Sequence, residues 1–252
     1  MINLILSIIV GAAGYFAASF IFESIGACVF VSILFFIAGM IVFNRMTQKK
    51  LMAIMNKAND MMQNIPKLPS EIARANLIEK CIEEFKGAYK YKNYTFFLEQ
   101  QLNSQIGSIY YAQRKFDEAE PYLRNSFIRN GPSICMYACL LFKKGDDEGM
   151  VAQFEKAVKF TPRMPVLWNL YAWCLMERKK RDEAIAVLNR CLKVNPGDKI
   201  TKENLDLAKN GGKIKMRGYQ EQWYQFWLED PVEMQREMQK LLLDKHSVVR
   251  GR

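Results

Sequence analysis

Two apolar stretches dominate the start of the chain. Residues 2–22 contain no charged side chain and neither do residues 25–43, with Glu23 as the one charge between them. Each stretch is about 20 residues long, which at a rise of about 1.5 Å per residue lets a helix cross a hydrocarbon layer about 30 Å thick. The pattern therefore predicts a transmembrane helical hairpin over residues 1–43.

Small residues are spaced along both apolar stretches. Gly11, Gly14 and Ala18 in the first, and Ala38 and Gly39 in the second, would allow two helices to approach closely in lipid. The same residues would suit a homo-oligomer, although we favour the hairpin. A cleaved signal peptide is the rival interpretation of the first stretch, but that stretch lacks a basic segment at its start.

Basic residues follow the second apolar stretch closely. They are Arg45, Lys49, Lys50 and Lys57, whereas the turn of the hairpin carries Glu23. Short segments rich in lysine and arginine stay on the cytoplasmic side of a membrane. We therefore expect an integral protein of a bacterial inner (plasma) membrane, with both termini and everything after the hairpin in the cytoplasm.

The segment after the hairpin has a helical pattern with one interruption. Residues 44–64 contain no proline or glycine, so the second span is expected to continue as a juxtamembrane helix and linker over residues 44–69. Ser70 precedes a new run of apolar residues at helical spacing and is expected to cap it through its side chain. We expect residues 70–95 to form an N-terminal capping helix for the next domain and its connection.

From residue 96 the apolar positions recur with a period of about 34 residues. The best unit, Pro165 to Asp198, combines the large, small and proline positions that let two antiparallel helices pack. Its key residues are Trp168, Ala172, Leu175, Ala184, Leu188, Cys191 and Pro196. The same offsets return in Tyr137, Ala138, Leu141, Phe154, Ala157 and Pro162, and again in Ile106, Gly107, Tyr110, Ala119, Leu123 and Ser126. These units resemble the tetratricopeptide repeat.

The resemblance implies an all-α fold in which a right-handed α-solenoid, with extra C-terminal helices, follows the hairpin. Residues 96–209 would hold three such repeats and a solvating helix, which glycines 211 and 212 would end. Acidic residues at 117–118, 146–148 and 182–183 are placed to begin the second helix of each repeat, where they oppose the helix dipole. Such a solenoid is typical of a binding scaffold.

In tetratricopeptide proteins the first helix of each repeat lines a concave groove that holds a partner. Carried over position by position, the resemblance assigns to this groove Ser104, Ser108, Tyr111, Cys139, Phe142, Lys143, Asn169, Trp173, Met176 and Glu177. The family's clamp for a C-terminal carboxylate needs more polar residues than Lys143 and Asn169 provide. The groove therefore predicts an apolar or amphipathic protein segment as partner, although some of these residues would alternatively pack inside the solenoid.

Aromatic residues crowd the stretch after the repeats, within residues 210–252. They are Tyr219, Trp223, Tyr224, Phe226 and Trp227. Three places for this contact segment are open: the end or groove of its own solenoid, a partner protein, and the membrane interface. An amphipathic helix is predicted beyond Pro231, and the single histidine, His246, follows in a basic tail.

The net charge and the absence of known catalytic motifs limit the classes of function that we expect for this protein. A formal net charge of +10 suits nucleic acid, acidic proteins or an anionic membrane, and the apolar stretches favour the membrane over nucleic acid. The six cysteines lack metal-ligand spacing, so we expect no metal site and no cofactor, and Cys174 and Cys191 read as small buried residues rather than a disulfide. No nucleophile with a base, phosphate loop or HExxH motif is present, so we expect no enzymatic activity.

Together these patterns predict a membrane-anchored scaffold or adaptor that binds protein partners at the cytoplasmic face of a membrane. The alternative is a structural subunit of a larger membrane complex, assembled through the hairpin and the aromatic C-terminal segment. A homo-oligomer is compatible with both.

Overall fold

The structure, a computed structural model, describes residues 2–229. Every regular element in this range is a helix, which confirms the predicted all-α fold. The chain divides into two compact units, Met1–Ile109 and Tyr110–Arg252. The amphipathic helix expected beyond Pro231 and the tail with His246 lie outside the described residues.

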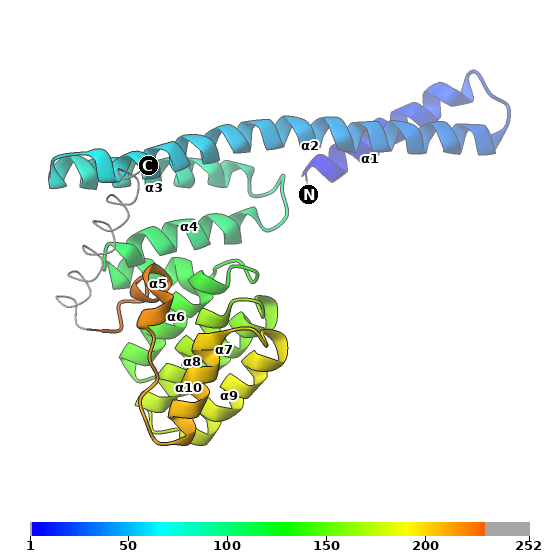
Figure 1. The fold of residues 1–252 in the computed structure, drawn as a ribbon. Coiled ribbons are helices and arrows are strands. Elements are labelled where there is room, and N and C mark those ends of the chain that lie inside the picture. The colour runs from blue at the N-terminus through cyan, green and yellow to red at the C-terminus, as the bar shows by residue number, and fades with distance from the viewer. Residues whose placement is uncertain (1, 230–252) are drawn as a thin grey trace, which may run out of the picture. The chain divides into compact units, whose positions relative to one another are not determined.

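The first unit begins with a helical hairpin. Helices α1 (Ile2–Ser19) and α2 (Ile25–Asn64) lie side by side (Figure 1) and are both long and apolar enough to cross a membrane. A Cβ atom added to Gly14 would lie 2.8 Å from Cγ of Phe35 on the facing helix, which is closer than real Cβ contacts come. The glycine is therefore needed for the two helices to pack at this distance.

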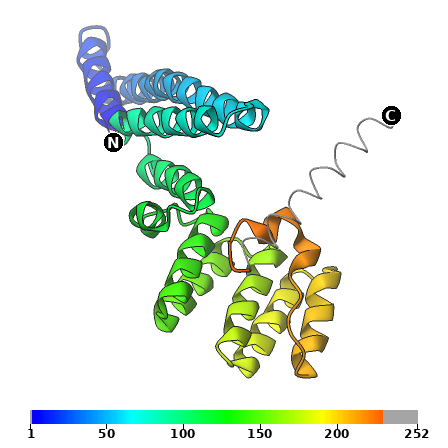
Figure 2. The ribbon, with the colours of Figure 1, turned by 90° about the vertical axis from the view of Figure 1, so that its left-hand side faces the viewer.

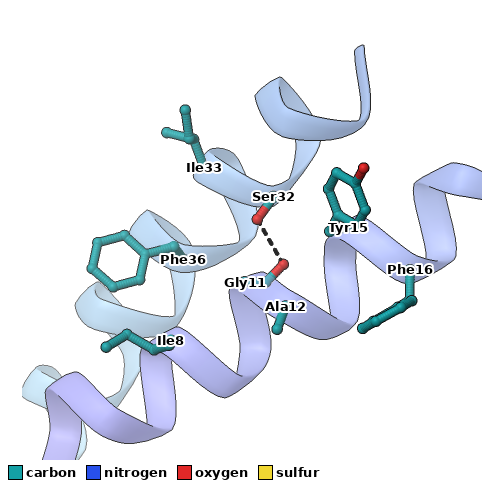
Figure 3. A pocket seen from close by; sticks show the side chains of 8 residues that line it. All are labelled: Ile8, Gly11, Ala12, Tyr15, Phe16, Ser32, Ile33 and Phe36. Carbon is teal, nitrogen blue, oxygen red and sulfur yellow. Dashed lines mark hydrogen bonds between the residues drawn. The ribbon is translucent and has the colours of Figure 1, made fainter. Parts of the chain in front are cut away.

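Small residues line the rest of this hairpin contact. Ser32 Oγ donates a hydrogen bond of 2.8 Å to the Gly11 carbonyl oxygen, at the wall of an open apolar hollow between the helices (Figure 3). Ala18 and Gly39 are buried at the same contact, as expected. Ala38, expected there too, is exposed, because it lies on the face of α2 that is turned away from α1.

Helix α2 runs without a break far beyond its apolar half, as the sequence predicts. Helix α3 (Glu71–Gly87) packs against this second half, where Cys81 Sγ donates to the Ala58 carbonyl oxygen at 3.5 Å and both residues are fully buried. The role of α3 as a cap of the first repeat stays a prediction, and its contact with α2 lies within the first unit. Ser70 precedes α3 as expected, although its side chain makes no capping hydrogen bond.

The second unit is a series of helix pairs (Figure 2). Its helices are α5 (Phe116–Arg124), α6 (Gly131–Lys144), α7 (Asp147–Phe160), α8 (Pro165–Glu177), α9 (Arg181–Val194) and α10 (Lys199–Lys209), and α4 (Leu98–Ala112) spans the boundary of the two units. Short 3-10 turns η1 (Ile65–Lys67), η2 (Ala88–Tyr91) and η3 (Arg217–Tyr219) and the short helix α11 (Glu221–Tyr224) complete the described chain.

Local sequence signals explain where the repeat helices begin and end. Gly145 adopts a left-handed backbone with φ of 80°, which ends α6, and the Asp146 carboxylate then accepts the Gly149 amide at 2.9 Å to cap α7. The acidic residues at 117–118, 147–148 and 182–183 all lie in the first turn of a second helix, as predicted. Between the pairs, the Phe154 and Tyr171 rings stack with centroids 5.0 Å apart.

Candidate partner-binding face

The first helices of the repeats bring together four of the side chains expected to contact a partner. We call these residues, Tyr111, Phe142, Asn169 and Trp173, the repeat face. The Phe142 and Trp173 rings meet edge to face with centroids 5.9 Å apart. Lys143 Nζ, next to Phe142 in the chain, lies 5.9 Å from the centroid of the Tyr111 ring. Arg178 lies over the Phe142 ring, with Cζ 4.3 Å from its centroid. The face is thus aromatic, with cations at its edge.

The chain itself covers this face. Residues 213–229, here called the aromatic segment, leave the end of α10 and turn back towards α8 (Figure 1). Trp223 is fully buried and its ring lies edge-on against Trp173, with centroids 5.3 Å apart. The Tyr111 hydroxyl donates a hydrogen bond of 2.6 Å to the Phe226 carbonyl oxygen. Of the three places open to this segment, the structure has it on its own solenoid.

Asn169 joins the repeat face to the aromatic segment through polar contacts. Its side chain is fully buried, and Nδ2 donates to Thr201 Oγ1 at 2.7 Å and to the Tyr219 hydroxyl at 2.8 Å. Its Oδ1 accepts Nδ2 of Asn204 at 2.9 Å, and the Asn204 amide also pairs with the backbone of Lys215. A buried amide surrounded by partners in this way fixes the register of the segment.

The repeats that carry this face match a known family. Residues 132–163 and 166–198 each match the family model described as tetratricopeptide repeat. Helices α6 to α9 are therefore similar in sequence to tetratricopeptide repeats. A comparison with curated proteins found no match. The match does not reach helices α4 and α5, so the tetratricopeptide unit expected at residues 96–131 stays a prediction.

The other residues expected in the tetratricopeptide groove have different surroundings. Cys139 is fully buried in the core, Met176 is half-buried against it, and Glu177 is exposed. Ser104 and Ser108 lie on the part of α4 that belongs to the first unit, where the Ser104 hydroxyl donates to the Gln100 carbonyl oxygen at 3.0 Å. The structure therefore does not bring all ten residues together on one open surface.

Burial changes the acid–base behaviour of the face. Burial raises the pKa of Tyr111 well above its usual value, and it also raises the pKa of the Cys135 and Cys174 thiols. Lys143 has a pKa lowered by desolvation, because it lies against the Tyr111 and Phe116 rings. The tyrosine and the thiols stay neutral at physiological pH, so they provide packing and hydrogen bonds rather than nucleophiles.

The cysteines and acidic residues of the described chain form no further site. All six cysteines are free and buried. Within residues 2–229, no group of three or more His, Cys, Asp or Glu side chains is placed to hold a metal ion.

The contact between the aromatic segment and the repeats includes features that lower its stability. The indole Nε1 of Trp223 is buried and has no hydrogen-bond acceptor, a defect worth about 1–3 kcal/mol. Gln220 and Trp227 both have a φ of 50°, a backbone region that non-glycine residues adopt only with strain. The segment therefore combines strong aromatic packing with features that oppose it.

The sequence did not predict the polar side chains of α10 that contact Asn169. Thr201 and Asn204 on α10 are buried, although α10 was expected only to solvate the end of the repeats. One local signal was available, because Asp198 caps the start of α10. Its carboxylate accepts hydrogen bonds from the amide and the hydroxyl of Thr201, and a third from the hydroxyl of Tyr219 at 2.8 Å. An Asp-x-x-Thr start marks a helix cap, but it does not reveal a tyrosine about 20 residues further on as a third partner.

Proposed function

We propose that this protein is a membrane-anchored tetratricopeptide scaffold that binds a protein partner at the cytoplasmic face of a bacterial inner membrane. The partner would occupy the repeat face and displace the aromatic segment. The observation that carries the proposal is the Trp173–Trp223 contact at 5.3 Å, since it presents an aromatic side chain of a linear segment to the first helix of a repeat. Tetratricopeptide repeats typically bind protein segments in this way.

The chemistry of the covered face specifies the kind of partner. The face offers rings at Phe142 and Trp173, the Tyr111 hydroxyl as a donor to a main-chain carbonyl, and the Asn169 amide as a donor to a hydroxyl. A partner segment with one or two large aromatic side chains and few charges would match all of these groups. A charged carboxylate would meet two cations that are already engaged. Lys143 Nζ lies 4.0 Å from the centroid of the Phe116 ring, and Arg178 forms an ion pair of 2.7 Å with Asp147.

The apolar helices support the membrane part of the proposal. Side chains on the outer faces of α1 and α2 are large, apolar and exposed, among them Ile9, Phe16, Phe30 and Ile41. In water such a surface would be unfavourable, whereas lipid covers it without cost. The basic residues that follow the second span favour a cytoplasmic location of the repeats.

Binding rather than catalysis is the proposed activity. Proteins with tetratricopeptide repeats are generally interaction scaffolds, and the polar groups at the repeat face are already engaged with one another. The rival function, a structural subunit that docks through the aromatic segment, is less well supported because Trp223, Tyr224 and Phe226 are buried in their own unit.

A peptide-binding experiment tests the proposed face. The probe is a synthetic peptide of residues 213–229, added to full-length protein and to a variant that ends at Gly212, both in detergent. We expect the truncated variant to bind the peptide at least tenfold more tightly, because its face is open. Phe142→Ala in the truncated variant should weaken binding, whereas Phe160→Ala, at an exposed site on the second helix α7, should not. Equal binding to full-length and truncated chains would contradict the proposal.

Crosslinking in cells tests whether a partner uses the same face. A photo-reactive amino acid at position 142 should give an internal crosslink to the aromatic segment in the full-length chain. In the truncated variant it should give a crosslink to another protein instead. Trp223→Ala serves as a milder variant if truncation prevents folding. The scaffold should keep this partner when residues 2–43 are removed, while an assembly subunit would no longer enter its complex.

A further inference from the structure

A loop in the first unit is fastened to the beginning of α1. The Ile2 amide donates to the Asn93 carbonyl oxygen at 2.9 Å. The buried Asn3 side chain donates to the Tyr94 carbonyl oxygen at 3.4 Å and to Thr47 Oγ1 on α2 at 3.1 Å. These bonds fix the loop at the level where α1 starts and where residues 44–47 of α2 pass it.

That level is where the apolar surface of the hairpin ends. Leu4 and Ile5 of α1 and Val42 of α2 are exposed and apolar. Immediately beyond them α2 exposes polar and basic side chains: Asn44, Arg45, Gln48, Lys49 and Lys50. A helical hairpin that spans a bilayer has its headgroup interface at such a change.

The loop exposes aromatic and basic side chains at this level. Phe96 is 65% exposed and Phe97 is 58% exposed. Lys90 and Lys92 are also exposed, and Lys92 Nζ lies 3.6 Å from Glu99 Oε1 in an open ion pair that a lipid phosphate would have to replace. Phe97 has a φ of 59°, a conformation that a bulky residue adopts only with strain. The chain thus leaves two large neighbouring rings more than half exposed.

Two hollows flank Asn3 between the loop and the helices. One of about 170 Å³ is lined by Lys50, Tyr91 and Tyr94, among others. The other, of about 300 Å³, lies against Asn44 and Phe96. Each is lined by both hydrogen-bonding and apolar side chains, a mixture that suits the boundary between lipid headgroups and acyl chains.

We infer that residues 88–97, here called the interfacial loop, dock on the surface of an anionic bilayer. Phe96 and Phe97 enter the boundary between headgroups and acyl chains, while Lys90, Lys92 and Lys50 face the lipid phosphates. The inference rests on the proposed membrane anchoring and adds a second contact with the membrane, one that is selective for lipid charge. Through its fastening to Asn3, this contact fixes the first unit against the bilayer surface.

Fluorescence in lipid nanodiscs tests the interfacial loop with the full chain. An environment-sensitive dye is attached to cysteine in three separate variants: Phe96→Cys, Ile72→Cys and Phe30→Cys. Ile72 is 74% exposed at the start of α3, which follows the far end of α2, so it is a matched exposed apolar control. The unsubstituted chain, whose six cysteines are buried, gives the labelling background.

The inference predicts a distinct result at each position. The dye at position 96 should be quenched by brominated lipid and shift its emission to the blue, more strongly when phosphatidylglycerol is added to phosphatidylcholine. The dye at position 72 should show neither effect. Lys90→Gln together with Lys92→Gln should weaken the response to phosphatidylglycerol at position 96, and the further change Lys50→Gln should weaken it again.

The dye at position 30 separates the two proposals. Quenching at 30 without quenching at 96 would overturn the interfacial loop and leave the membrane anchor in place. The absence of quenching at both positions would overturn the anchor as well. Quenching at 96 that does not depend on phosphatidylglycerol would overturn the lysine–phosphate part of the inference.

Discussion

Replacing Asn169 with alanine removes the centre of the polar network that holds the aromatic segment. The substitution deletes the donor to the Tyr219 hydroxyl, at 2.8 Å, and the acceptor for Asn204 Nδ2, at 2.9 Å. Tyr219 keeps its bond to the Asp198 carboxylate and Asn204 keeps its bonds to the Lys215 backbone. Tyr219 and Asn204 each lose one hydrogen bond but are not left without any.

The expected loss follows from these contacts. An uncompensated buried polar group costs about 1–3 kcal/mol, and because the partners here keep other bonds each loss lies near the lower end of that range. Of the three partners only Tyr219 belongs to the aromatic segment, since Thr201 and Asn204 lie on α10. The loss that affects the segment is therefore about 1 kcal/mol. At about 1.4 kcal/mol per factor of ten, local opening of the segment becomes about fivefold more frequent.

Hydrogen–deuterium exchange measures this opening directly. Amides of residues 214–226 in the full-length chain should exchange faster in Asn169→Ala by about that factor, because exchange follows the free energy of local opening. Amides of α1 should not change. Asn189→Ala is the matched control, since Asn189 is exposed and donates only within its own helix, to the Ile185 carbonyl oxygen.

The reasoning fails if the two variants behave alike. It also fails if Asn169→Ala speeds exchange throughout the repeats by the same factor as in residues 214–226. That outcome would mean that Asn169 supports the repeats as a whole and does not hold the segment in particular.

Two further predictions concern the hairpin and one ion pair. Gly14→Ile should separate α1 from α2, because even a Cβ would lie 2.8 Å from Phe35, and should lower the melting temperature in detergent, whereas Ala17→Ile on the exposed face should not. The hydrogen bond from Arg190 lowers the pKa of Glu155 below its usual value. This pair therefore stabilises the fold above the unfolded-state pKa, and the contribution is lost as the pH falls through the lower folded-state value. Since both side chains are partly exposed, the effect is below about 1 kcal/mol, and Arg190→Gln should remove this pH dependence from urea unfolding measured between about pH 3 and 5.

Elements that depend on local pattern could be predicted from the sequence. The uncharged stretches give α1 and α2, and the spacing of small and large residues gives the helix pairs α6–α7 and α8–α9. In the same way Trp168 lies where the repeat pattern expects it and donates its indole N–H to the Pro162 carbonyl oxygen at 2.9 Å. Each of these signals depends on residues within one repeat, so the spacing of residues along the sequence is enough to predict these elements.

Contacts between distant residues could not be predicted in this way. The Tyr111 hydroxyl meets the carbonyl oxygen of Phe226, 115 positions later, and nothing in the period of the repeats specifies that pairing. The pattern shows that five aromatic residues must be buried, but not where. The placement of α3 on α2 is similar, because an apolar stripe shows that a helix has a partner without naming it.

The covalent attachment of the aromatic segment has a quantitative consequence for the proposed partner binding. A ligand carried on the same polypeptide is present at a fixed effective concentration, on the order of millimolar for a short connection, however much protein the cell makes. Under the proposed displacement, this internal competitor raises the apparent dissociation constant of an incoming ligand by a constant factor, which equals one plus the ratio of closed to open segment. Single substitutions near Trp223 would change that factor without altering the surface that receives the ligand.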